Sequence, residues 1–266
     1  KGNILPSLVI FAIPLIISNV FQQLYNTADI MIVGHYLGDT SLAAIGASTV
    51  IFELLVGFTL GFGNGLSIVV ARNFGSGNKE AIKKSVALSL IIGLAITIII
   101  TIGSRFFLYP LLKALKTPEL ILNESYVYIS TITLFIVVMF GYNLCAGLLR
   151  AIGNSFAPLV FLVISSLLNI VLAIFFIAHM KMGINGAAIA TAIAQGISVI
   201  LCLFYIKNKA KILIPNKKHF ENDKILYKEL ISQGLSMALM SSIVSLGSVV
   251  LQSSINNLGF LTIAGH

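Results

Sequence analysis

The sequence predicts an all-α, polytopic membrane protein: a six-helix transmembrane lobe followed by the first helix of a second, repeated lobe. Of its 266 residues, 58% are hydrophobic and only 10% are charged, and the mean hydropathy is +1.01. A soluble domain carries about 25% charged residues. The apolar residues also gather in seven stretches of about 20–30 residues, and each stretch is long enough to cross a bilayer as a helix.

The first stretch, Leu8–Gly34, contains no Lys or Arg, and its one acid is Asp29. As a helix it would be about 40 Å long. Five polar residues of its second half fall within an arc of about 120°. They are Asn19, Gln22, Gln23, Asn26 and Asp29. Polar groups are costly in hydrocarbon unless they face protein or water, so we expect this stripe, Gln22 and Gln23 included, to line an interior cavity.

The second stretch, Leu42–Val70, carries the acid Glu53 and a run of small residues. The run is Gly57-x-x-x-Gly61-x-Gly63-x-Gly65. Small residues four apart allow membrane helices to approach closely, so the run predicts tight packing or a local bend. A phosphate-binding loop is excluded because no strand precedes the run and no Gly-Lys-Ser/Thr follows it.

The third stretch is Ser85–Phe107, and Pro110 and Pro118 after it predict that no helix continues there. The remaining stretches are Tyr126–Leu149, Pro158–Ala178, Gly186–Ile206 and Leu230–Leu258. Asn169 interrupts the fifth stretch, and Thr191 and Gln195 lie one turn apart in the sixth. Such neutral polar groups either hydrogen-bond between helices or line a cavity.

The distribution of positive charge predicts the orientation. Thirteen of the 17 Lys and Arg residues lie at the N-terminus or in the second–third, fourth–fifth and sixth–seventh links. Cytoplasmic links carry such an excess, so we place the N-terminus inside the cell and the protein in the cytoplasmic membrane. The net charge of +8 therefore reflects topology, and we expect no nucleic-acid partner. We divide the chain into a lobe (1–206), a basic cytoplasmic linker (207–228) and a truncated second lobe (229–266).

A weak internal repeat supports this division. A shift of 221 residues places Leu37-Gly38 on Leu258-Gly259 and the first stretch on the seventh. Two parallel six-helix repeats are an architecture that transporters use, and they predict a complete protein of about 440 residues. Because the sequence begins at Lys1 without Met, we expect its true start to be missing.

Asp29 is the strongest candidate site residue, because a carboxylate at the centre of a membrane helix costs about 2.5–3.5 kcal/mol. The alternative is an interfacial acid that reaches water. Glu53 is a second candidate, although a single acid can also simply face a wet cavity. A membrane enzyme is the rival class. Its chemistry needs several carboxylates or a known motif, and the sequence offers neither, so we expect no enzyme and no cofactor.

With these residues in view, the whole chain resembles the N-terminal lobe of a multidrug and toxic compound extrusion (MATE) transporter. The resemblance rests on the order and spacing of several motifs. These are Asn26-x-x-Asp29 with Gly34, Gly38 and Leu42-Ala-Ala-Ile-Gly46; Arg150-Ala-Ile-Gly153-Asn154 with Pro158 and Asn169-Ile-Val-Leu172; and Gly183-x-x-Gly186-Ala-Ala-x-Ala-Thr191-x-x-x-Gln195.

The resemblance implies two six-helix lobes around a central cavity, and export of bulky, often cationic, organic compounds by a protein that we expect to be monomeric. Inward flow of protons or sodium would drive this export. The family's cation site maps onto Asp29, Asn169 and Thr191, with Asn26 expected in the hydrogen-bond shell. Where the family has a second acid, this chain has Ala173. Hard cations need several oxygen ligands and a proton needs one carboxylate, so we favour a proton, with sodium possible at the same residues.

Two other classes of transport protein fit the sequence less well. A lipid-linked oligosaccharide flippase of the same superfamily would also stack six-helix lobes, but a pyrophosphate-bearing substrate predicts a more cationic cavity. A channel fits a two-lobe repeat less well, because such repeats are suited to alternating access.

Overall fold

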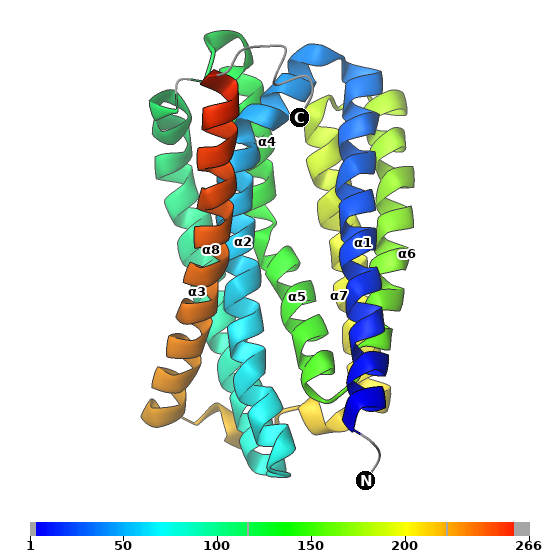
Figure 1. Ribbon diagram of the computed structural model, residues 1–266, viewed down its shortest axis with the longest axis vertical. Helices are drawn as coiled ribbons and strands as arrows, with labels where there is room; N and C mark the ends of the chain where they lie inside the picture. The colour runs from blue at the N-terminus through cyan, green and yellow to red at the C-terminus, as the bar shows by residue number, and fades with distance from the viewer. Residues whose placement is uncertain (1–3, 116, 222, 258–266) are drawn as a thin grey trace.

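The computed structural model describes residues 4–115, 117–221 and 223–257, which form a bundle of long helices without a strand (Figure 1). The α-helices are α1 (Ile4–Leu37), α2 (Asp39–Gly75), α3 (Lys79–Ala114), α4 (Glu119–Leu134), α5 (Ile136–Ala151), α6 (Phe156–Ile174), α7 (Ile184–Lys209) and α8 (Lys224–Asn257). A π-helical turn, Phe175–His179, extends α6. The predicted all-α class is confirmed.

The helices are long and apolar enough for a membrane protein. Within the described residues, five helices are long and apolar enough to span a bilayer, and the bent pair α4–α5 would add a sixth if the pair forms one span. The predicted seventh stretch corresponds to α8. Its side chains at 244–246 and 248–257 lie outside the described residues, as does Leu258, so its membrane crossing stays a prediction.

The bundle has two sides joined by α5 (Figure 1). On one side α2 packs along α8 and against α3, and on the other side α1, α6 and α7 pack together. Helix α5 contacts both α2 and α7. Its buried residues, such as Phe140, Leu144 and Leu148, belong to one apolar core that also contains Phe62 of α2 and Cys202 of α7.

The predicted fourth stretch is two helices, not one. The chain bends by 48° between α4 and α5, at Phe135. There the amide of Phe135 bonds to the carbonyl of Ile132 at 3.1 Å, and the hydroxyl of Thr101 on α3 donates to the carbonyl of Thr133 at 3.1 Å. A side chain that satisfies a carbonyl at a helix break is a recognised cause of a bend. Because no Gly or Pro stands at residues 134–136, nothing in this segment of the sequence predicts the bend.

The prediction that Pro110 ends the third helix is wrong, because α3 continues through it to Ala114. Proline removes one backbone hydrogen bond and crowds the preceding turn. Here the last turn is held by packing: Leu108 and Leu112 are buried against Ile51 of α2 and Ile129 of α4. Tertiary contact therefore outweighs the local cost.

Helix α7 ends at Lys209 and α8 begins at Lys224, so the segment between the two helices falls inside the linker predicted at 207–228. Two short 3₁₀ turns, Lys211–Leu213 and Lys217–Phe220, lie between them. His219 is buried, and its Nε2 lies 3.0 Å from a carboxylate oxygen of Glu80 on α3. Lys84 of α3 also pairs with Asp223 at 3.0 Å. The linker is therefore attached to the beginning of α3.

Candidate functional site

Three polar residues from three helices meet inside the bundle. Thr191 of α7 contacts Asp29 of α1, with 3.3 Å between the hydroxyl oxygen and the carboxylate Oδ2. Asn169 of α6 donates from Nδ2 to the same hydroxyl oxygen at 3.1 Å. Asn169 is fully buried and Thr191 is nearly so. The structure thus brings together residues 162 positions apart in sequence.

This cluster has more buried acceptors than donors. The single hydroxyl hydrogen of Thr191 faces both Asp29 and the carbonyl oxygen of Ala187, which lies 3.1 Å from the hydroxyl oxygen. The second carboxylate oxygen of Asp29, Oδ1, and the amide oxygen of Asn169 are buried and find no hydrogen-bond partner among the described residues. Unpaired buried acceptors are costly, and a bound cation or proton would satisfy them.

Two tyrosines that the sequence analysis did not single out lie beside Asp29. The phenolic groups of Tyr25 and Tyr128 are close enough to interact electrostatically with its carboxylate. The Tyr25 hydroxyl is buried and unpartnered within the described chain. Tyr25 stands one turn before Asp29, so helical spacing could have found it. Tyr128 comes from α4, and only the tertiary packing of α4 brings it there.

The other predicted site residues lie apart from the three-residue cluster. Asn26 and Gln23 are exposed on α1, and Gln22 is partly buried. None of these three is joined to Asp29 by a hydrogen bond that the described side chains show. Glu53 lies on α2 and is partly buried. Gln195 is buried one turn beyond Thr191, and its amide oxygen lacks a partner in the described part of the chain.

Ala173 stands one turn after Asn169 on α6 and is fully buried. This is the position at which the resemblance leads us to expect a second acid. The cluster therefore contains one carboxylate, that of Asp29, together with neutral oxygens of an amide and a hydroxyl.

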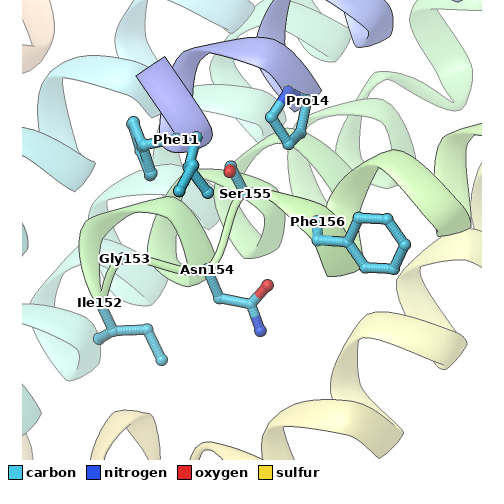
Figure 2. Close-up of a pocket in the computed structure, with 8 residues that line it drawn as sticks. Phe11, Pro14, Ile152, Gly153, Asn154, Ser155 and Phe156 are labelled. Carbon is cyan, nitrogen blue, oxygen red and sulfur yellow. The ribbon is translucent and has the colours of Figure 1, made fainter. Parts of the chain in front are cut away.

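An open pocket of about 630 Å³ lies well away from this cluster (Figure 2). Ile10, Phe11 and Pro14 of α1 line one part of it. The rest is lined by residues 152–155, which connect α5 to α6, and by Phe156 at the beginning of α6. Pro14 precedes Asp29 by 15 residues, which is about 22 Å along a helix. The pocket is thus near the beginning of α1, and Asp29 is near its end.

Comparisons with known proteins agree with this architecture. The sequence profile of the family described as MatE matches residues 14–175. The Bacillus subtilis (strain 168) protein named "Probable multidrug resistance protein YpnP" is 30% identical over 267 residues, which cover all of this chain and 59% of that protein. The chain thus spans little more than half the length of this relative.

Two solved structures are similar in fold. One is titled an outward-facing conformation of a multidrug resistance MATE family transporter of the MOP superfamily. It has a TM-score of 0.85 at 26% identity and covers 93% of this chain and 55% of that one. The other is titled an inward-facing conformation of such a transporter. It has a TM-score of 0.78 at 26% identity, with 85% and 51% covered. With the match to the family profile, these likenesses show that the chain belongs to the MATE family of membrane transporters.

Proposed function

We propose that the complete protein is an antiporter that exports bulky, often cationic, organic compounds across the cytoplasmic membrane while a cation flows inward. The proposal rests on family membership and on one observation, the excess of buried acceptors at Asp29, Asn169 and Thr191. A site that has no positive charge and keeps unpaired buried oxygens is suited to take up a cation. The names of the relatives support an organic substrate.

We infer that the coupling ion is a proton. A proton on Asp29 would turn its acceptor-only carboxylate into a donor and supply the hydrogen that the cluster lacks. A sodium ion would need more oxygen ligands, and Ala173 leaves the cluster with a single carboxylate. One charge that crosses the full membrane potential provides about 2.3 kcal/mol per 100 mV, which is enough to drive accumulation.

The proposed cycle is alternating access between two six-helix lobes, with one monomer as the working unit. The charge bias of the links supports an inner location for the N-terminus and the linker. Asp29 then lies about 12 Å along α1 from the outer end of that helix, within reach of external protons.

The test uses the full-length protein in inside-out vesicles, with a fluorescent organic cation as substrate. We expect uptake to follow an imposed pH gradient and not a sodium gradient. Asp29→Asn keeps the shape of the side chain but cannot titrate, so the variant should insert normally and lose gradient-driven uptake. The double variant with Asn26→Asp and Asp29→Asn shows whether a carboxylate at residue 26 can substitute for the carboxylate of Asp29. Undiminished uptake in Asp29→Asn would overturn the proposal, and uptake driven by sodium alone would replace the proton.

A further inference from the structure

The turn between α5 and α6 leaves backbone donors unused. Asn154 holds this turn, because its Oδ1 accepts from the amide of Ala157 at 3.0 Å and its Nδ2 donates to the hydroxyl of Tyr205 at 2.8 Å. The amides of Ser155 and Phe156 find no acceptor in the described part of the chain. The first amides of a helix point outward along its axis, so these two N–H groups are available to a ligand.

Ser155 has a buried hydroxyl group without a partner. The residue is 6% exposed and holds the N-cap position of α6. Its hydroxyl does not cap the helix, and the described residues give it no other hydrogen bond. Figure 2 shows the hydroxyl oxygen on the side of the turn that faces α1, where the pocket lies. A buried hydroxyl group without a partner costs free energy, so it indicates an acceptor supplied by a ligand.

The charges around this turn favour an anion. The N-terminus of α6, a helix of 19 residues, carries partial positive charge. Arg150, in the last turn of α5, forms no ion pair with the described residues, and its Nε is buried without a partner. Its carbonyl oxygen accepts from the amide of Gly153 at 2.9 Å, so the arginine adjoins the turn. None of the described residues that line the pocket is acidic. Unused donors beside a cation therefore favour a phosphate group.

The same pocket also presents apolar surface. Ile10 of α1 is 70% exposed and Phe156 of α6 is 66% exposed, and both line the pocket. Helices α1 and α6 begin at the same end of the bundle (Figure 1), and the headgroup layers of a bilayer lie at the ends of membrane-spanning helices. With the proposed orientation, this end lies in the cytoplasmic leaflet. A ligand that combines a phosphate with hydrocarbon chains therefore fits the pocket better than free phosphate.

We propose that this pocket binds the phosphate group of a phospholipid from the cytoplasmic leaflet. The phosphate oxygens accept from the Ser155 hydroxyl and from the amides of Ser155 and Phe156, and the hydrocarbon chains lie along Ile10 and Phe156. The site goes beyond the proposed transport cycle, and only its assignment to a leaflet depends on the proposed orientation. The cluster at Asp29 has unpaired acceptors, whereas this pocket has unpaired donors.

The first arm of the test identifies which part of the ligand is recognised. Full-length protein in nonionic detergent is titrated with dioctanoyl phosphatidylglycerol, and native mass spectrometry counts the lipids bound to each protein. We expect one lipid to bind saturably. Dioctanoylglycerol has the same chains without the phosphate and should bind at least about tenfold more weakly, because hydrogen bonds to a charged group are strong. An excess of inorganic phosphate should leave the lipid bound, because it lacks the chains.

The second arm changes the turn and keeps the helix. Aspartate is as favourable at the N-cap as serine, so Ser155→Asp should fold and melt as the parent does. Its carboxylate repels a phosphate, so we expect the bound lipid to be lost. Ser155→Ala removes only the hydroxyl and should weaken binding about tenfold. Ser76→Asp is the matched control, because it adds the same charge at an exposed position on the same end of the bundle, directly after α2.

The results distinguish a phospholipid from free phosphate and from an apolar ligand. Equal affinity for dioctanoylglycerol, or lipid binding that Ser155→Asp leaves unchanged, overturns the phosphate site. Displacement of the lipid by inorganic phosphate overturns the phospholipid and identifies free phosphate as the ligand. If Ser155→Asp melts at a lower temperature than the parent, unchanged affinity in Ser155→Ala overturns the site. Equal loss of binding in Ser76→Asp does so too. Transport is measured in neither arm, so failure of the proposed function leaves these results unaffected.

Discussion

On one side of the bundle α1, α6 and α7 meet through polar side chains, and on the other side α2 and α8 meet through bare backbone. The hydroxyl of Thr191 joins Asp29 to Asn169 and leaves two buried oxygens unpartnered among the described residues. At the contact between α2 and α8, which we call the seam, Gly65 faces Gly234 and Phe62 packs over Gly234, and the hydroxyl of Ser241 lies beside Gly61. The first region is incompletely satisfied, and the second is tightly packed.

This contrast indicates different roles for the two regions. Buried polar groups without partners reduce stability, and proteins retain them where a ligand completes the set. Close packing of two helices contributes stability and fixes how closely the helices approach. We therefore expect changes at the polar cluster to affect ion-dependent transport more than folding, and changes at the seam to affect folding and conformation first.

The largest expected effect is a loss of stability in Phe62→Ala. The ring is 1% exposed, and its removal opens a cavity between α2 and α8. Truncation of a buried Phe costs about 3–5 kcal/mol. Thermal unfolding of the purified full-length protein, followed by size-exclusion chromatography, measures it. Phe106→Ala on α3 is the control, because Phe106 is 71% exposed and should have little effect. Equal stability in the two variants would contradict a packed seam.

For Thr191→Val we expect a smaller change in free energy than for Phe62→Ala, together with a weaker affinity for the coupling ion. The methyl group keeps the volume and removes the hydroxyl that links Asp29 to Asn169. Loss of a buried hydrogen-bond partner costs about 1–3 kcal/mol, which corresponds to an ion affinity about 5- to 150-fold weaker. The concentration of coupling ion at half-maximal uptake reports this affinity. Thr191→Ser keeps the hydroxyl and should behave nearly as the parent. An unchanged ion dependence in Thr191→Val would remove the hydroxyl from the site.

The smallest effect concerns pH and the linker. The backbone amide of Leu226 and the ammonium of Lys84 hold the pKa of Asp223 below its usual range. A carboxyl group with a lowered pKa contributes stability that is complete above the unfolded pKa, about 3.9, and is lost as pH falls through the folded pKa. The difference in melting temperature between the parent and Asp223→Asn should therefore be constant from about pH 6 to 8 and shrink below about pH 4. A difference in melting temperature that changes near neutral pH would contradict the assignment of this pH dependence to Asp223.

The sequence was sufficient for much of the fold because the signals were local. Hydropathy located the membrane helices, and polar residues within apolar stretches pointed to Asp29, Asn169 and Thr191. Their contact follows from the resemblance to a family, since no spacing relates residue 29 to residue 191. The bend at Phe135 depends on a hydroxyl from α3, and the continuation of α3 through Pro110 depends on packing against α2 and α4. The residues around Phe135 and Pro110 contain no pattern that would predict these contacts with other helices.

The docked linker has a consequence for biosynthesis. Chains leave the ribosome N-terminus first, so α2 and α3 are in place before residues 210–223 emerge. Leu213 and His219 are buried there, and Asp223 pairs with Lys84, at the beginning of α3. The docked linker thus places the beginning of the nascent α8 beside α2, which is already inserted. The glycines of α2 then determine how closely the two helices pack.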